Sequence, residues 1–162
     1  MSTTPTASIT PATPAAPAPP TVNGQVVGLA HHATRAVLER LLARTGTTFQ
    51  QSVALNAVAG SGAPIDRDQL VARMTDALKI DDSAVLAAIA ELTASGLLET
   101  LPTEDSRLRL TDAGQMLSQE IRTGGAEIAA RLYRDLPADD LAAAARVLTT
   151  VTARANAELA EA

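Results

Sequence analysis

The sequence predicts a mainly α-helical protein that carries a small two-stranded β-hairpin, and three observations lead to this prediction. Apolar residues recur at steps of three and four along most of the chain, which is the spacing of one helix face. The apolar content is 46%, yet the 162 residues include one Phe, one Tyr and no Trp, so the core must be aliphatic. The stretch from residue 97 to 111 instead carries the alternation and the central loop of a hairpin.

The composition excludes several classes of protein. No Cys is present, which rules out disulfides, thiolate zinc sites and cysteine nucleophiles. No apolar run is long enough to cross a bilayer, and the N-terminus lacks the basic start and apolar centre of a signal peptide. We therefore expect a cytoplasmic protein with no membrane partner.

The first 22 residues form a low-complexity arm of Thr, Ala, Pro and Ser. This arm holds six of the nine prolines and no charged side chain. Such a composition cannot bury enough surface to offset the entropy lost on ordering. Residues 1–22 are expected to be a disordered extension, and a docking role is the alternative.

Residues 23–46 are predicted to form a long helix with a wide apolar stripe. A stripe of this width usually packs against two partners, so the helix is expected to contact both its own core and a second subunit. The residues of the stripe fall at steps of four and three: Val26, Ala30, Ala33, Val37 and Leu41.

Residues 47–59 and 66–78 are predicted to form two shorter helices, with a break rich in glycine between them. Thr47 or Thr48 can cap the first of these helices, because a threonine hydroxyl accepts one of the free backbone N–H groups. Asp66, with a Gln three residues on, resembles a capping box that opens the second helix.

A fourth helix is predicted over residues 83–95. Val85, Ile89 and Leu92 recur at helical spacing along it, and Gly96 then ends the helix. This helix leads directly into the hairpin.

Two short strands, residues 97–101 and 107–111, are expected to flank a five-residue loop. The second strand alternates arginine and leucine, which places the leucines toward the core and Arg107 and Arg109 toward water. Thr111 can then cap the next helix.

Residues 114–162 are predicted to form two long helices with apolar seams, and long helices with such seams need a partner. Together with the first helix they are expected to interlock with a second copy as a homodimer around a two-fold axis. Gly124 and Gly125 interrupt the first seam, which indicates a kink or a close helix crossing; a position beside an effector cavity is the alternative. The seams consist of Leu117, Ile121, Ile128, Leu132 and Leu136, and of Leu141, Ala144, Leu148, Val151, Ala155 and Leu159.

From about residue 24 to the end, this order of elements resembles the winged helix-turn-helix of the MarR family of bacterial transcription regulators. Residues 134–141 also resemble the family's turn into its last helix. The family's motifs Leu-x-x-x-Gly-Leu, before the wing, and Leu-Thr-x-x-Gly, after it, are matched by Leu92, Gly96 and Leu97, and by Leu110, Thr111 and Gly114.

The resemblance implies a regulator that binds double-stranded DNA as a homodimer on a palindromic operator and responds to a small-molecule effector. Ser83 at the start of the recognition-type helix, and Arg107 and Arg109 on the wing, are the candidate DNA-binding residues. The sequence assigns no ligand-binding residues for an effector. The chain would divide into an N-terminal dimerisation helix (23–46), a winged helix-turn-helix lobe (47–113) and C-terminal dimerisation helices (114–162).

The charge of the predicted lobe leads to a second hypothesis. Affinity for nucleic acid rests first on Lys and Arg, yet residues 47–113 hold five basic and ten acidic residues, a net charge of −5 that equals the charge of the whole chain. The recognition-type helix contains no Arg, Lys, Asn or Gln, the residues that usually read base edges. The alternative is a winged-helix dimer with weak or lost DNA binding that acts through protein–protein contacts. For Arg107 and Arg109, the alternative to phosphate contacts is a solvated strand face paired with Glu99.

Catalysis, a metal site and a cofactor are not predicted. His31 and His32 are neighbours on one helix, with no Cys and no carboxylate within one helical turn. The sequence has no Gly-x-Ser-x-Gly or His-Glu-x-x-His motif, so we expect the protein not to be an enzyme. A third hypothesis, a small-molecule binding module that uses a cavity between helices, has no convergent polar cluster in the sequence to support it.

Overall fold

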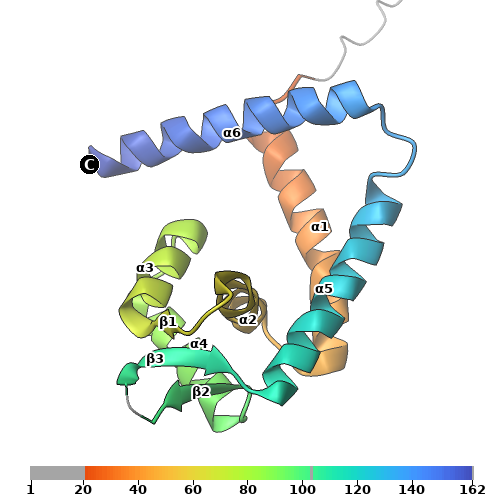
Figure 1. The fold of residues 1–162 in the computed structure, drawn as a ribbon. Helices are drawn as coiled ribbons and strands as arrows, with labels where there is room; N and C mark the ends of the chain where they lie inside the picture. The colour runs from red at the N-terminus through yellow and green to blue at the C-terminus, as the bar shows by residue number, and fades with distance from the viewer. Residues whose placement is uncertain (1–20, 103, 162) are drawn as a thin grey trace, which may run out of the picture.

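The computed structural model describes residues 21–102 and 104–161, and within them the chain forms six helices and one small antiparallel sheet (Figure 1). The prediction of a mainly helical protein with a β wing is confirmed. Residues 1–20, most of the arm predicted over residues 1–22, lie outside the described residues. The elements are α1 (Gly24–Thr45), α2 (Phe49–Ser61), β1 (Ile65–Asp66), α3 (Arg67–Leu78), α4 (Asp82–Ala94), β2 (Leu98–Leu101), β3 (Glu104–Leu110), α5 (Asp112–Leu132) and α6 (Ala138–Ala160).

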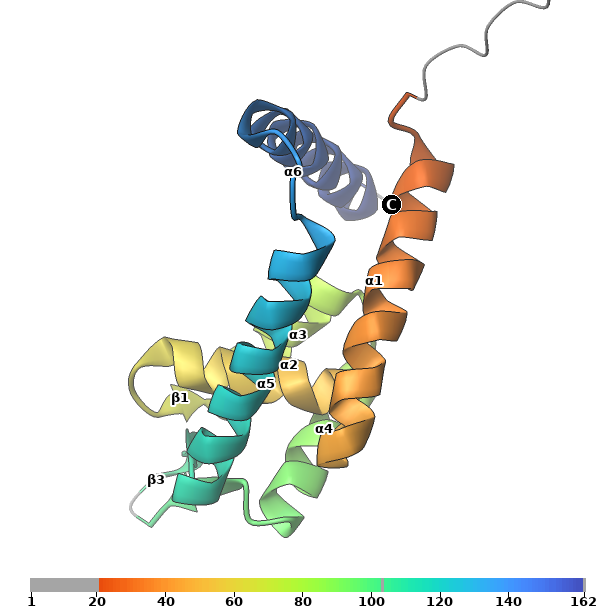
Figure 2. The same ribbon diagram turned by 90° about the vertical axis from the view of Figure 1, so that its right-hand side faces the viewer.

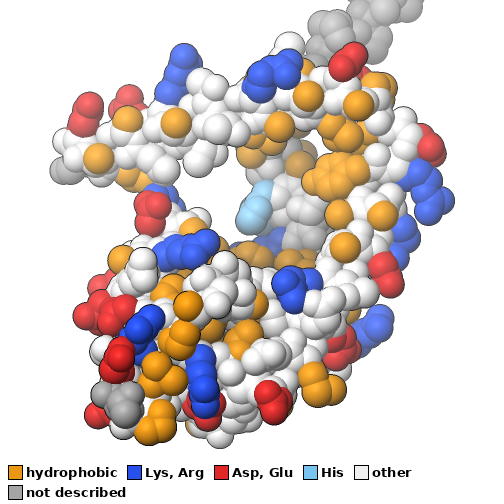
Figure 3. Space-filling view, viewed as in Figure 1, with side chains coloured by type: hydrophobic (Ala, Val, Ile, Leu, Met, Phe, Trp, Pro, Cys, Tyr) orange, Lys and Arg blue, Asp and Glu red, His pale blue; other side chains and the backbone are white. Residues whose placement is uncertain are grey.

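The helices divide into two groups: a lobe and the long helices α1, α5 and α6 outside it. α2, α3, α4 and the sheet form the lobe, α1 and α5 rise from it side by side, and α6 runs across their far end (Figures 1 and 2). An open gap separates much of α6 from the lobe (Figure 3), but Leu159 near the end of α6 lines a groove together with residues of α3 and the start of α4. Each helix of the described residues is too short or too polar to span a bilayer.

The close helix crossing predicted at the glycine pair is confirmed for Gly124. A Cβ built on Gly124 would lie 2.8 Å from Cδ2 of Leu41 on α1, whereas one built on Gly125 would meet nothing within 4 Å. The absence of a side chain at Gly124 therefore lets α5 approach α1.

The core lies inside the lobe and extends to the ends of α1 and α5 that contact it, and apart from a few polar residues such as Ser118 it is aliphatic, as the composition predicts. Each fully buried leucine removes its side chain from water, which contributes about 1.5–3 kcal/mol relative to exposure. α6 contributes no buried residue. The largest fully buried side chains are Leu42, Leu55, Leu70, Met74, Val85, Leu92, Leu98, Leu108 and Ser118.

The sheet has three strands rather than the two predicted. β1, which is only Ile65–Asp66, pairs antiparallel with β3 and places Ile65 opposite Leu108, so that the strand order is β1-β3-β2. Two residues are too few to show a period-two alternation, and the sequence therefore gives no local signal for β1. β3 also begins earlier than the predicted strand 107–111, at Glu104, which shortens the loop of the hairpin.

The helices α2 and α3 begin with the predicted cap residues, but the capping box expected at Asp66 is incomplete, since the Gln69 side chain does not bond back to the Asp66 N–H. The Thr48 hydroxyl accepts from the backbone N–H of Gln51 at 3.2 Å, and the Gln51 side chain accepts from the Thr48 N–H at 2.9 Å, which completes a capping box. The Asp66 carboxylate accepts from the backbone N–H of Asp68 at 3.0 Å. These bonds satisfy donors that a helix cannot satisfy itself.

Lys79 ends α3 in the left-handed region, with φ 53° and ψ 47°. A residue with a Cβ loses about 1–2 kcal/mol in this conformation, whereas glycine adopts it freely. We expect Lys79→Gly to raise the free energy of unfolding by about 1 kcal/mol in urea denaturation, because the lost ion pair with Asp76 (2.8 Å) is exposed and weak. Arg73→Gly, inside α3, is the control and should lower the same quantity by about 1 kcal/mol. If Lys79→Gly lowers the free energy of unfolding as Arg73→Gly does, the conformation of Lys79 is not strained.

Candidate nucleic-acid interface

α4, the helix predicted to face DNA, is fixed to the lobe by one apolar face. Val85, Ile89 and Leu92 on that face are exposed by 3% or less, so the 3.6-residue periodicity predicted the buried side correctly. The opposite face is exposed and carries mainly alanine, with Leu86 45% exposed. Near the end of the helix the Glu91 carboxylate accepts from the Gln51 side chain of α2 at 2.7 Å. This face is accessible to a partner but offers few hydrogen-bond donors.

Ser83 lies in the first turn of α4, directly after Asp82, and is exposed. The N-cap residue Asp81 makes no side-chain cap hydrogen bond. The Asp82 carboxylate instead accepts from the Thr75 hydroxyl at 2.9 Å, which joins the start of α4 to α3. The start of α4 therefore presents a serine hydroxyl directly after two carboxylates.

The wing, formed by β2 and β3, has the predicted alternation. Leu108 and Leu110 are buried, at 0% and 9% exposure, and Arg107 and Arg109 occupy the other face of β3. Side chains two residues apart on a strand share a face. The structure thus brings the two arginines onto one side of the wing, while Ser83 lies on a separate element.

Arg109 forms a cross-strand ion pair with Glu99, the residue directly opposite it on β2. Its Nε donates to Oε1 of Glu99 at 2.7 Å, and about half of each side chain is exposed. The pairing expected for a solvated strand face is therefore confirmed for Arg109. Exposed pairs of this kind contribute about 0–1 kcal/mol, so a phosphate oxygen can replace Glu99 at little cost.

Arg107 is held differently. Its Nη2 donates to the carbonyl oxygen of Pro64 at 2.6 Å, and its Nη1 lies 3.4 Å from Oε2 of Glu104. The expected pairing with Glu99 is wrong for Arg107, because Arg107 lies opposite Asp66 of β1, on the side of β3 away from β2. The Pro64 contact was not predicted from the sequence. It joins residues 43 positions apart and forms because the two-residue strand β1, directly after Pro64, pairs with β3.

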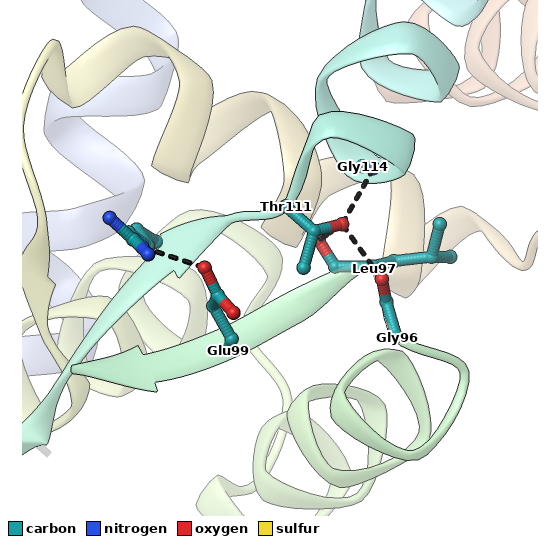
Figure 4. A network of polar contacts seen from close by, with 6 residues as sticks. Gly96, Leu97, Glu99, Thr111 and Gly114 are labelled. Atoms are coloured by element: carbon teal, nitrogen blue, oxygen red, sulfur yellow. Dashed lines mark hydrogen bonds and ion pairs between the residues drawn. The ribbon is translucent and has the colours of Figure 1, made fainter. Parts of the chain in front are cut away.

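The root of the wing is closed by a small hydrogen-bond network (Figure 4). The Thr111 hydroxyl donates to the carbonyl oxygen of Gly96 at 2.7 Å and accepts from the Gly114 N–H at 3.0 Å. The Thr111 N–H donates to the carbonyl oxygen of Leu97 at 3.2 Å. One threonine therefore joins the start of the wing, its end and the first turn of α5.

Gly114 is essential to this arrangement because α5 passes directly over the wing root. A Cβ built on Gly114 would lie 2.0 Å from the carbonyl oxygen of Leu97, a distance no real Cβ contact reaches. Gly96 is in the left-handed region, with φ 67°, which glycine adopts without strain. The two motifs that carried the family resemblance thus have a physical role, because they set the position of the wing against α5.

Three of the five basic side chains of the lobe each pair with one carboxylate. Within the described part of the lobe, Lys79, Arg107 and Arg109 each pair with a carboxylate, whereas Arg67 and Arg73 form no ion pair. Figure 3 shows acidic and basic side chains interspersed over the visible face of the lobe. The lining of a groove of about 690 Å³ between α3 and the start of α4 includes one basic residue, Lys79, and four acidic residues, Asp68, Asp76, Asp81 and Asp82.

The comparisons with known proteins concern the fold. No protein-family model matches the sequence, and no curated protein matches it. Among solved structures, a MarR-family transcriptional regulator from Rhodococcus sp. RHA1 is similar at TM-score 0.67 and 15% identity, over 80% of this chain and 92% of that one. NadR in complex with 4-hydroxyphenylacetate is similar at TM-score 0.66 and 20% identity, over 83% and 98% of the two chains.

CouR from Rhodococcus jostii RHA1, bound to p-coumaroyl-CoA, is similar at TM-score 0.68 and 15% identity, over 80% of this chain and 90% of that one. These similarities extend over nearly the whole length of each solved chain and over at least 80% of this one. The protein has the winged helix-turn-helix fold of the MarR-family transcriptional regulators.

Proposed function

We propose that the protein is a MarR-type transcriptional regulator that binds a palindromic operator as a homodimer. The observation that carries this proposal is the exposed helix α4 beside a wing on which the guanidinium of Arg109 is accessible. The fold that holds them is shared with such regulators over 80% of the chain. In a two-fold dimer the two α4 helices would enter successive major grooves, about 34–36 Å apart.

Self-association is supported by the exposed apolar surface of the long helices α1 and α6. α6 has no buried residue, although it carries the predicted seam, and Leu148, Val151 and Leu159 on that seam are 41–62% exposed. Val26 and Leu29 at the start of α1 are also exposed. Monomeric proteins rarely leave such contiguous apolar surface in water. A second copy that covers α1, α6 and the end of α5 is the dimer we propose, with residues 23–46 and 114–162 as its dimerisation parts.

The proposed DNA contacts have distinct roles. Arg109 would exchange its carboxylate partner for a phosphate, and the Ser83 hydroxyl would donate from the start of α4 to the DNA backbone. Arg107 would contribute less, because one side of its guanidinium is already bound to Pro64. We also propose that a small molecule shifts the spacing of the two lobes, since NadR and CouR have been solved with small molecules bound.

Arg109→Ala is expected to weaken operator binding about tenfold across all sequences, and Arg107→Ala to weaken it less. Each lost phosphate contact removes the release of a counterion, so the slope of log affinity against log salt should also become shallower. The measurement is a titration of the purified protein, at several salt concentrations, against the DNA that flanks its own gene, with random duplex as competitor. Arg131→Ala, outside α4 and the wing but in the proposed dimerisation part, removes the same charge and is the control. It should bind as the wild type does once sedimentation shows an unchanged dimer.

A second candidate function is a winged-helix dimer that acts through protein–protein contacts. The exposed face of α4 favours it, because this face combines Leu86 and alanines with carboxylates and has no basic residue. A basic, amphipathic protein segment would complement this surface better than a phosphate backbone does. Absence of competitor-resistant DNA binding even at low salt, where charge interactions are least screened, would overturn the regulator and favour this second function.

A further inference from the structure

The exposed side chains of α4 decide which bases this helix can distinguish in the major groove, where the proposed function places it. Its core face is covered by the rest of the lobe and cannot reach DNA. None of its exposed residues is Arg, Lys, Asn or Gln, the residues that make paired hydrogen bonds to base edges. Apart from four alanines, the exposed residues of α4 are Asp82, Ser83, Leu86, Glu91 and Thr93.

Most of the polar side chains on this face are already bound within the lobe. The Glu91 carboxylate accepts from the Gln51 side chain of α2 at 2.7 Å. The Asp82 carboxylate accepts from the Thr75 hydroxyl of α3 at 2.9 Å. The Thr93 hydroxyl donates to a backbone carbonyl oxygen one turn earlier in α4, at 2.8 Å. These bonds draw the two carboxylates toward α2 and α3, so the middle of the exposed face is left to uncharged residues.

Leu86 is the large apolar side chain on this face, and it is 45% exposed. Ala87 follows it directly, and Ala90 lies one turn further along the helix. Because alanine side chains are short, the helix can come close enough to base edges for Leu86 to contact them. Ser83, the remaining polar residue, lies at the start of the helix, where its proposed contact is with the DNA backbone. The middle of α4 can therefore recognise a base only through an apolar contact.

The edges of the bases in the major groove carry one kind of apolar group. Thymine presents a methyl group at C5, whereas adenine, guanine and cytosine present hydrogen-bond donors and acceptors. Apolar side chains contact this methyl group and gain by removing it from water. An apolar helix face that enters the major groove can thus distinguish thymine from the other bases without a hydrogen bond.

We propose that Leu86, with Ala87 and Ala90 beside it, reads thymine methyl groups in each half-site of the operator. This specificity rests on the proposed function, because α4 must enter the groove to reach the methyl groups. Phosphate contacts such as that of Arg109 would supply affinity, and Leu86 would supply the choice of sequence. A recognition-type helix that lacks the usual base-reading side chains can select an operator in this way.

The test uses the DNA that flanks the protein's own gene, prepared with thymine, with uracil or with 5-bromouracil at every thymine position. Uracil pairs with adenine as thymine does but lacks the methyl group, which 5-bromouracil replaces by a bromine atom of similar size. Each lost methyl contact should weaken binding about fourfold, so two half-sites should weaken it more than tenfold in the uracil duplex. The 5-bromouracil duplex should recover most of the affinity. Random duplex in the same three forms is the control and should bind equally in each.

Leu86→Ala tests the residue itself. Leu86 is exposed and alanine favours a helix, so this substitution leaves the fold intact. The ratio of the affinities for the thymine and uracil duplexes should fall about fourfold or more. The slope of log affinity against log salt should stay unchanged, because no phosphate contact is lost. Met116→Ala removes an exposed apolar side chain from α5 instead and should leave the ratio of affinities unchanged.

The thymine duplex separates failure of this specificity from failure of the proposed function. If the wild type binds it saturably but binds the uracil duplex equally well, the reading of methyl groups is overturned and the regulator function stands. An unchanged ratio of affinities in Leu86→Ala would overturn the role of Leu86. Absence of saturable binding to the thymine duplex would overturn both the specificity and the regulator function, and it would favour the protein–protein function.

Discussion

Gly114→Ala is expected to lower the free energy of unfolding by about 3 kcal/mol, at the upper end of the range for overpacking. The added methyl group would lie 2.0 Å from the carbonyl oxygen of Leu97 and 3.0 Å from its carbonyl carbon. These atoms are backbone atoms, which cannot rotate away as a side chain can. The start of α5 would have to move, and the bonds of Thr111 to Gly96 and Leu97 would be strained or broken.

Urea denaturation followed by circular dichroism measures this effect, and Gly125→Ala is its matched control. Gly125 lies on the same helix, and a Cβ there meets nothing within 4 Å. Alanine favours the helix over glycine, so this control should gain up to about 1 kcal/mol. Equal stabilities for the two variants would show that α5 does not approach the wing root as closely as described.

The helices could be predicted from the sequence because their signals are local. The apolar period over residues 83–95 placed Val85, Ile89 and Leu92 on one face, and all three are buried. Thr48 and Thr111 cap helices as expected, since a cap depends on residues only three positions apart. Such features need no knowledge of the rest of the chain.

Features that depend on distant residues could not be predicted in the same way. β1 exists because Ile65 and Asp66 pair with β3, more than forty positions later, and the Arg107 contact with Pro64 follows from that pairing. The sequence indicated that Gly114 belongs to a motif, but the carbonyl group of Leu97 that requires a glycine there is visible only in the fold.

For the two wing arginines, the sequence predicted the strand face correctly, but it predicted the hydrogen-bond partner correctly for only one of them. Strand alternation placed Arg107 and Arg109 on one face, but it could not show that one pairs with Glu99 and the other with Pro64. These different partners are the reason that we expect unequal effects from the two alanine substitutions. Ser83, Arg107 and Arg109 as DNA-binding residues stay a prediction that the salt titration tests.

The combined substitution Leu148→Asp and Val151→Asp is expected to convert the proposed dimer into monomers. The two residues are one helical turn apart on the seam of α6 and are 41% and 50% exposed within one chain, so the change costs the monomer little. In the dimer each new carboxylate would be buried without a partner, at several kcal/mol per charge. The dissociation constant should rise more than about 100-fold, since each 1.4 kcal/mol is a factor of ten. Sedimentation at micromolar concentration measures the change.

The control places the same two charges on the opposite side of α6, as Thr150→Asp and Ala153→Asp. Both positions are exposed, and neither belongs to the seam of Leu148, Val151 and Leu159. This control should remain dimeric, because the new carboxylates stay in water. A wild-type monomer, or dissociation of both variants alike, would contradict a dimer built on the seam. Because a monomer presents one wing instead of two, the seam variant should also lose about half of the salt dependence of operator binding.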